Sequence, residues 1–175
     1  MKKIEITLYE FSELSEEAQN KAIEKLYDIN IGHDWWEFTY EDAKNIGLKI
    51  TSFDLDRNRH ATGDFIESGL NVAESIIKEH GESTNTHKTA LQYISNLKEL
   101  TEKLNSAEIY GEENYGIQAK IEGEIEESEQ EFLSDLLEDY SIILQRESEY
   151  LQSRESIIET IEANEYDFTE DGKIY

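Results

Sequence analysis

Cysteine is absent from the chain, and no long apolar run interrupts its 175 residues. Without cysteine there are no disulfide bonds, no thiolate metal ligands and no cysteine nucleophile, a composition that fits a cytosolic protein. The first thirty residues lack the apolar core of a signal peptide, and no apolar stretch approaches the roughly 20 residues of a membrane-spanning helix. The sequence therefore predicts a soluble, cytoplasmic protein.

Basic residues are scarce: the chain has 16 lysines and arginines, compared with 41 aspartates and glutamates, and its formal net charge is -25. Residues 107–175 contain 21 of the acidic and only 4 of the basic residues, a net charge of -17. A small domain needs a net charge of only about 2 to 8 for solubility. The electrostatic field of this excess negative charge repels nucleic acids and anionic membranes and attracts basic surfaces. We therefore expect a basic protein as the partner, with no direct binding of nucleic acid or membrane.

A run of glutamates leads into a long amphipathic stretch, residues 122–151. Ser128 and Glu131 fit a capping box, and Glu129 and Glu131 would lie at the positive end of the helix dipole, so a helix is predicted to begin at Ser128. Its apolar residues recur at spacings of three and four, as on one stripe of an α-helix: Phe132, Leu133, Leu136, Leu137, Tyr140, Ile143, Leu144 and Leu151. Simple solvation is the ordinary alternative for the charged residues.

Alternation of apolar and polar residues predicts short strands elsewhere in the chain. The expected strands are residues 4–8, 48–56, 60–66 and 115–125. A slip in the alternation between Ile50 and Phe53 predicts a β-bulge in the second of them. The last residues, from Tyr166 to Tyr175, are expected to form a C-terminal hairpin around a turn at Gly172.

Helical spacing and capping residues predict the other elements. Ser15 opens one helix, Asp34 and Glu37 cap a second that ends at Gly47, and Ser156 with Glu159 opens a short helix near the C-terminus. Further helices are expected at residues 67–80 and 85–104, followed by a loop at 106–114. We therefore expect a single α+β domain over residues 1–175, with several amphipathic helices packed on a small, mainly antiparallel sheet.

Asp54, Asp56 and Asn58 place oxygen ligands at alternate positions, as the start of a calcium-binding loop does. Arg59 stands where such a loop needs glycine for its sharp turn, and Phe65 stands where it needs a bidentate glutamate. The sequence therefore favours a hairpin whose charged residues are solvated or paired, and it assigns no metal ligand and no cofactor.

Four aromatic residues lie within six positions: Trp35, Trp36, Phe38 and Tyr40. They are predicted to begin a helix, and core packing is the common role of such residues. Since four residues at this spacing cannot all point to one side of a helix, we expect at least one to be partly exposed and able to contribute to an interface.

The segments 14–23, 34–44 and 47–51, which read LSEEAQNKAI, DWWEFTYEDAK and GLKIT, resemble a family of uncharacterised proteins of phages, prophages and mobile elements. Residues 157–166 are similar as well, so the resemblance covers most of the chain. It implies an accessory protein acting in the cytosol of a bacterial host, and some members of the family are described as antitoxins. Small acidic proteins of mobile elements are often inhibitors of host defence, anti-CRISPR proteins among them.

Charge and resemblance together predict a non-enzymatic, anti-CRISPR or other anti-defence inhibitor that binds the basic nucleic-acid or guide-RNA groove of an RNA-guided nuclease or similar effector. An antitoxin that neutralises a cognate toxin is one alternative, and a metal-dependent hydrolase that uses His60 with residues 54–64 is a second. No catalytic residue is assigned. The predicted partner-binding residues are acidic, with two tryptophans: Glu122, Glu124, Glu126, Glu127, Glu129, Glu131, Asp135, Glu138, Asp139, Trp35 and Trp36.

Overall fold

The computed structural model describes residues 5–109 and 115–175. Contacts define two compact units: we call Trp36–Leu144 the central unit, and Met1–Trp35 with Gln145–Tyr175 the terminal unit. Helix α5 (Tyr115–Leu151) contributes residues 115–144 to the central unit and 145–151 to the terminal unit. The expectation of a single domain stays a prediction.

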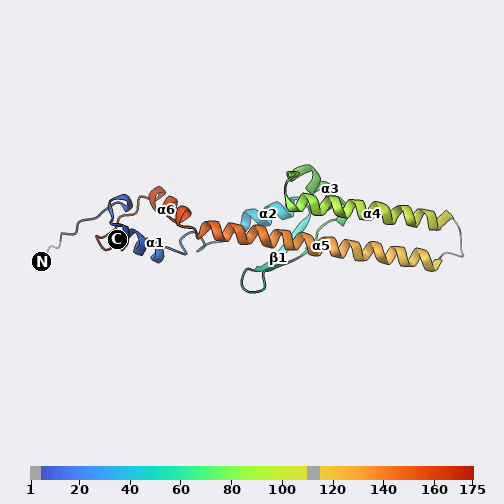
Figure 1. Cartoon of the computed structure of the whole chain (residues 1–175), viewed down its shortest axis with the longest axis horizontal. Helices are drawn as coiled ribbons and strands as arrows, with labels where there is room; N and C mark the ends of the chain where they lie inside the picture. The colour runs from blue at the N-terminus through green and yellow to red at the C-terminus, as the bar shows by residue number, and fades with distance from the viewer. Residues whose placement is uncertain (1–4, 110–114) are drawn as a thin grey trace. The chain divides into compact units, whose positions relative to one another are not determined.

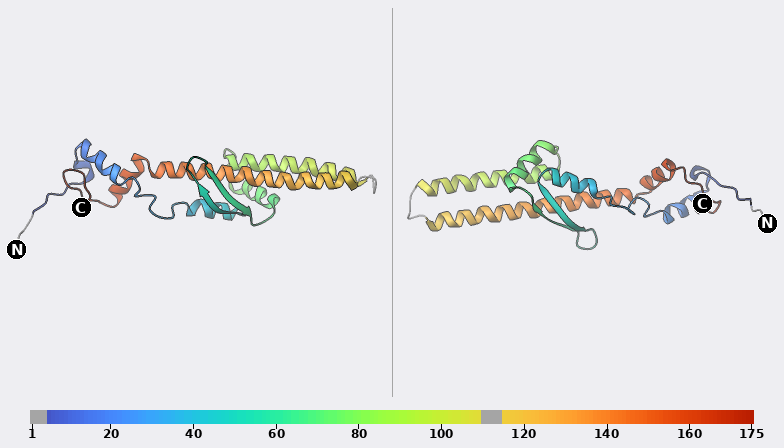
Figure 2. Two further views of the ribbon diagram at one scale, coloured as in Figure 1. Left: turned by 90° about the horizontal axis from the view of Figure 1, so that it is seen from below. Right: turned by 180° about the vertical axis from the view of Figure 1, so that it is seen from behind.

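The central unit combines two long helices with a hairpin and two shorter helices. Figures 1 and 2 show α4 and α5 running side by side in opposite directions. Its elements are α2 (Glu37–Asn45), β1 (Leu48–Asp54), β2 (His60–Phe65), α3 (Gly69–Glu79), α4 (Asn85–Ile109) and most of α5. The predicted α+β class, with helices packed on a small antiparallel sheet, is confirmed.

Strands β1 and β2 form the predicted hairpin. Leu48 pairs with Phe65 and Asp54 pairs with His60, and the register shifts between Ile50 and Ser52, which confirms the bulge. The preceding Gly47 has a φ of 90°, a left-handed conformation that glycine adopts without strain at a helix C-terminus. The predicted end of α2 is therefore confirmed.

Aromatic rings from α4, α5 and β2 form the centre of the core. The ring of Tyr93 stacks on that of Phe132 with a centroid distance of 4.3 Å and an interplanar angle of 5°. Phe65 contacts Phe132 at a centroid distance of 5.4 Å. Leu136 and Tyr140, at spacings of four from Phe132, are fully buried. The apolar stripe predicted for residues 132–144 is therefore the face of α5 that packs into the core, except for Ile143, which is 38% exposed.

Helix α5 begins at Tyr115, so the strand predicted for residues 115–125 is wrong. Ile117, Ile121 and Ile125 are spaced by four residues, a spacing that fits both the period of a strand and about one turn of a helix. The capping box at Ser128 is also wrong, because Ser128 lies well inside α5. Helix α4 continues through Ile109, so the loop predicted for 106–114 is wrong up to residue 109, and its remainder lies outside the described residues.

Helix α2 begins at Glu37 rather than at Asp34, so the predicted D-x-x-E cap is wrong. The backbone amide of Trp35 donates to the carbonyl of His33 at 2.8 Å, a turn that precedes the helix. Trp36 is the N-cap residue and makes no side-chain capping bond. Helices α3 and α4 occupy the predicted stretches, and the Ser68 hydroxyl caps α3 by accepting from the amide of Asn71.

The terminal unit contains the short 3-10 helix η1 (Phe11–Glu13), α1 (Glu16–Lys25), the end of α5 and α6 (Arg154–Ala163). Ser15 caps α1 as predicted, with its hydroxyl accepting from the amide of Ala18. The rings of Phe11 and Phe168 meet edge to face at 6.0 Å. The core around them consists of buried apolar residues: Phe11, Leu14, Ala18, Ala22, Ile157, Ile161 and Phe168.

Asn30 connects three segments of the terminal unit. Its side-chain amide donates to the carbonyl of Leu151 and to the hydroxyl of Ser156, each at 3.0 Å, and its oxygen accepts from Thr160 at 2.7 Å. Ser156 is therefore a buried partner of Asn30, and the predicted capping box at Ser156 is wrong, because Ser153 caps α6. Both polar atoms of this buried amide are therefore hydrogen-bonded, to the end of α5 and to α6.

The two ends of the terminal unit meet through isolated bridges rather than strands. Tyr9 pairs with Phe168, and Phe168 pairs with Ile174 around a turn at Gly172. The C-terminal turn is therefore where it was predicted, without forming a regular hairpin. Residues 5–8 of the predicted strand have no regular structure, and residue 4 lies outside the described residues. None of the helices in the described part of the chain is long and apolar enough to cross a membrane.

Gly172→Ala is expected to lower the free energy of unfolding by about 2–4 kcal/mol. Gly172 has a φ of 78°, and an added Cβ would lie 2.2 Å from the carbonyl oxygen of Ala18. Urea denaturation followed by far-ultraviolet circular dichroism measures the change. The matched control is Gly32→Ala in the same unit, where the nearest atom would lie 3.7 Å away. Equal midpoints for the two variants would contradict this account of the turn.

Candidate functional site

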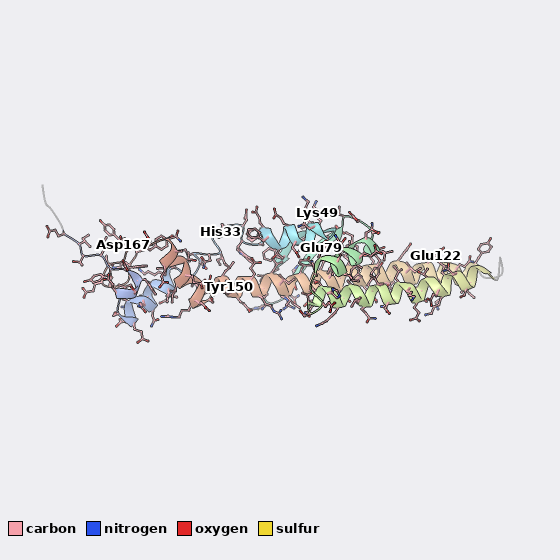
Figure 3. All side chains as sticks on the ribbon, turned by 90° about the horizontal axis from the view of Figure 1, so that it is seen from above. His33, Lys49, Glu79, Glu122, Tyr150 and Asp167 are labelled. Carbon is pink, nitrogen blue, oxygen red and sulfur yellow. The ribbon has the colours of Figure 1, made fainter. Side chains whose placement is uncertain are left out.

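Helix α5 distributes its acidic residues around its axis. Because successive residues turn by about 100°, Glu122 and Glu126 project from one side of the helix, whereas a second set projects from another. Figure 3 marks Glu122 on the stretch of α5 that runs beside α4. The second set follows spacings of three and four: Glu124, Glu127, Glu131, Asp135 and Glu138. The predicted binding residues therefore do not form a single face.

Two adjoining open cavities, of about 340 and 230 Å³, lie between α4 and α5. Asn96, Ser128 and Glu131 line both cavities, so the cavities form one groove. We call it the acidic groove, defined by its charged and amide residues: Lys88, Gln92, Asn96, Glu99 and Lys103 from α4, and Glu124, Glu127, Glu131 and Asp135 from α5. Tyr93 and Phe132 line it as well, so the groove reaches the edge of the core.

The α5 side of the acidic groove carries unneutralised charge. Glu127, Glu131 and Asp135 are exposed, and none of them forms an ion pair with another residue of the described ranges. Glu124 is 3.6 Å from Lys120 in an exposed pair, and on α4 Lys103 binds Glu99 at 2.8 Å. Exposed pairs of this kind contribute little to stability. The groove is therefore an open, net negative surface between two helices.

Glu129 has a different role from its neighbours in the acid run. Its Oε1 accepts a hydrogen bond from the backbone amide of Gly69 at 2.5 Å, at the first residue of α3. A carboxylate in this position satisfies an unpaired amide and lies at the positive end of the helix dipole. An added Cβ on Gly69 would lie 2.7 Å from this oxygen, so glycine permits the close approach. Glu129 therefore connects α5 to α3.

Asp139 is buried, with 9% of its surface exposed, and accepts a hydrogen bond from the Thr89 hydroxyl at 2.7 Å. Burial raises the pKa of its carboxyl group, the Thr89 bond opposes this change, and the nearby charges of Asp135 and Glu138 add to it. Asp139 therefore joins α5 to α4 inside the unit and has little surface with which to meet a partner.

Glu138 forms an ion pair with Arg59 at the tip of the hairpin. Arg59 also donates from Nε to the hydroxyl of Ser141 at 3.0 Å, and that hydroxyl donates to the carbonyl of Glu138 at 2.7 Å. The arginine thus bonds to two residues of α5. Glu138 holds the hairpin to the helix, and its charge is balanced within the central unit.

The two tryptophans are mainly packed. Trp35 is only 9% exposed, and the ring of Trp36 meets that of Phe53 edge to face at 5.5 Å. Tyr40 also contacts Phe53, at 6.2 Å. Phe38 is 80% exposed, which confirms that at least one of the four aromatic residues lies at the surface. The exposed member is therefore Phe38, which was not among the predicted binding residues.

The tip of the hairpin is arranged by local hydrogen bonds. The Asp54 carboxylate accepts from the backbone amide of Asp56 at 2.8 Å, and the Nδ1 of His60 lies 2.8 Å from the carbonyl of Asn58. Such a bond from an aspartate to the amide two residues later is an ordinary turn interaction. Over residues 5–109 and 115–175, no group of three or more histidine, aspartate or glutamate side chains is arranged to hold a metal ion.

Sequence reasoning missed the α4 side of the groove and a buried polar network. The α4 side is a polar stripe with spacings of four, four, three and four, formed by Lys88, Gln92, Asn96, Glu99 and Lys103. The sequence contains this stripe, but only its position beside α5 shows that it lines a groove. The network joins Asp42, His80 and Tyr140, and its members come from α2, the end of α3 and α5.

Tyr140 donates to the Asp42 carboxylate at 2.8 Å, and the Nε2 of His80 lies 3.6 Å from the same oxygen. The contact with His80, and then the bond from Tyr140, lower the pKa of Asp42 against the effect of burial. Burial, and then the negative charge of Asp42, raise the pKa of Tyr140. The network therefore holds an ionised carboxylate next to a neutral phenol.

Comparison of the chain with protein-family models, with curated proteins and with solved structures gives no match. The resemblance to proteins of phages and mobile elements stays a prediction.

Glu129→Ala is expected to lower the free energy of unfolding by about 1–3 kcal/mol, because the amide of Gly69 loses a charged acceptor. Glu122→Ala is the matched control, since Glu122 is an exposed residue on the same helix. Its effect is expected to stay within about 0.5 kcal/mol. Chemical denaturation of both variants measures the difference, and equal stabilities would show that Glu129 does not support α3.

Asp139→Asn is expected to raise Tm by a few degrees at pH 7, because asparagine keeps an oxygen for Thr89 and removes a buried charge. A folded-state pKa that is raised penalises folding above that pKa and has no effect below the unfolded value. The advantage of the variant should therefore disappear as the pH falls through about 4. Asp135→Asn, at an exposed position on the same helix, is the control; an equal gain in this variant would rule out a specific cost of burying Asp139.

Proposed function

We propose that the protein is a non-enzymatic inhibitor that uses the acidic groove to occupy a basic nucleic-acid-binding surface of another protein. The observation that supports this function best is the row of exposed carboxylates at Glu127, Glu131 and Asp135, which form no ion pair with any other described residue. They project from a helix whose rotation is set by its buried face. A partner would therefore meet them in a preformed arrangement, which reduces the entropy lost on binding.

Carboxylates can substitute for phosphates as ligands of lysine and arginine. Both groups accept charge-assisted hydrogen bonds, and arginine binds either of them with two parallel bonds. Residues separated by three or four positions on a helix lie about 5–6 Å apart, so Glu127, Glu131 and Asp135 present a regular row of negative charge. Such a row suits a protein surface on which basic side chains are spaced to bind a nucleic-acid backbone.

The proposed target is an RNA-guided nuclease, or a similar defence effector, in the cytosol of a bacterial host. Nucleases of this kind hold their guide in a positively charged channel, which matches the charge of the groove. The choice of target depends on the resemblance to proteins of mobile elements. Competition for the channel predicts inhibition when the protein binds before the guide RNA, and weak inhibition once the guide is in place.

The two alternatives have less support. An antitoxin interface centred on Trp35 and Trp36 would have little surface to use, since Trp35 is 9% exposed and Trp36 packs on Phe53. A metal-dependent hydrolase would need ligands in the hairpin, where Asp54 is bonded to the amide of Asp56. Neither alternative accounts for the unpaired charge on α5.

Reversing two charges in the groove, with Glu127→Lys and Glu131→Lys together, is expected to weaken binding to a basic partner by about tenfold or more. Two probes are suitable: a deca-arginine peptide, and a Cas9-type nuclease without its guide RNA. Wild-type binding to both should fall steeply between 50 and 200 mM salt, because exposed charges are screened. Isothermal titration calorimetry measures the affinities.

The matched control reverses Glu122 and Glu126, which have the same spacing on the same helix and project away from the groove. This control changes the net charge by the same amount, and it should retain affinity to within about threefold, because neither residue lines the groove. If both double variants lose affinity equally, net charge and not the groove determines binding. If the peptide binds through the groove and the nuclease does not bind, the groove remains a basic-partner site and the proposed target is wrong.

A further inference from the structure

A histidine nitrogen in the central unit is buried without a hydrogen-bond partner. His80 follows α3, and its side chain is 11% exposed. Its Nε2 is the buried side-chain polar atom that lacks a hydrogen-bond partner among the described residues. The nearest acceptor is Oδ2 of Asp42 at 3.6 Å, beyond the length of a normal hydrogen bond. A buried polar atom left unpaired in this way is costly and calls for an explanation.

The other ring nitrogen of His80, Nδ1, is hydrogen-bonded to the Thr86 hydroxyl at the end of a row of hydrogen-bonded hydroxyl groups. The Thr84 hydroxyl donates to the carbonyl of Gly81 at 2.8 Å, and the Thr86 hydroxyl donates to the oxygen of Thr84 at 3.2 Å. Each hydroxyl has only one hydrogen to donate. With the Thr86 hydrogen used in the bond to Thr84, the contact of 2.8 Å between Thr86 and Nδ1 of His80 takes its hydrogen from the histidine. In the neutral imidazole ring, which carries one N–H, this hydrogen is therefore on Nδ1.

With its proton on Nδ1, a neutral His80 presents the lone pair of Nε2 to Asp42. Asp42 accepts a hydrogen bond from the Tyr140 hydroxyl, and an aspartate carboxyl group is ionised at neutral pH. A lone pair and an ionised carboxylate are both acceptors, and no hydrogen lies between them. A second proton, placed on Nε2, converts this contact into a charge-assisted hydrogen bond.

We propose that His80 is a proton-operated latch: as the pH falls, Nε2 takes up a proton and bonds to Asp42, which fastens α2 to the junction of α3 and α4. This device does not depend on the function of the acidic groove. Because the bond to Asp42 forms only when Nε2 carries a proton, the latch stabilises the folded protein at low pH, and this stabilisation is lost as the pH rises.

The other charged groups near His80 are consistent with a cation at this position. From α3, Glu79 is bound to Lys78, and Lys78, followed by His80, lowers the pKa of its carboxyl group. From α4, His87 donates from Nδ1 to the carbonyl of His80 at 3.2 Å. From α5, Tyr140 bonds to Asp42. Asp42 therefore supplies the full negative charge opposite Nε2.

The test compares the Tm of wild type and His80→Gln between pH 8 and pH 5.5. The lower pH also weakens repulsion within a protein of net charge -25, so wild type alone is not informative. The difference in Tm between wild type and variant is expected to grow by roughly 2–4 °C as the pH falls. His33→Gln, at an exposed histidine, should follow wild type throughout. Parallel curves for wild type and His80→Gln would overturn the proposal.

A second variant and a spectroscopic measurement keep the test decisive if His80→Gln fails to fold. Asp42→Asn removes the charge opposite Nε2 at a half-exposed side chain, and it should flatten the pH dependence in the same way. In nitrogen-15 spectra of the imidazole ring, Nδ1 is expected to be protonated throughout, with Nε2 gaining its proton on acidification. A ring that is protonated only on Nε2 at pH 8 would show that Thr86 is the donor, and the latch would be rejected.

Discussion

The burial of one face of α5 is the constraint on which the rest of the central unit depends. Phe132 stacks on Tyr93, and Leu136 and Tyr140 continue the same face without any exposed surface. These three side chains define the rotation of the helix about its axis, because turning it would expose large apolar groups. Every other residue of α5 then has its direction set by its distance in sequence from this face.

The same rotation explains why a single run of acidic residues has several roles. Residues next to the buried face, such as Glu129 and Asp139, meet donors on α3 and α4 and are used inside the unit. Glu138 lies where the hairpin approaches and pairs with Arg59. Glu127, Glu131 and Asp135 remain at the groove without an ion pair to another described residue. Helical geometry therefore separates structural carboxylates from available ones within about three turns.

The sequence predicted the elements whose signals were unambiguous. Ser15 caps α1, Gly47 ends α2, and the bulge in β1 lies where the alternation slips. It was wrong where one pattern fits two structures: the spacing of Ile117, Ile121 and Ile125 suits a strand or a helix, and these residues lie in α5. The acidic run was visible, but its division into bonded and free carboxylates depends on contacts with Gly69, Thr89 and Arg59, which lie far away in sequence.

The unpaired negative charge on the groove affects both the proposed binding of a basic partner and the free energy of unfolding. Carboxylates at Glu127, Glu131 and Asp135 repel one another and the rest of a chain with net charge -25, so the folded state is held together by its apolar core against its own field. A basic partner would remove part of this repulsion as it binds. A partner that binds only the folded state also stabilises it, so tighter binding of a basic surface would raise the free energy of unfolding. Added salt would weaken this binding, but it would also screen the repulsion between carboxylates and so stabilise the free protein.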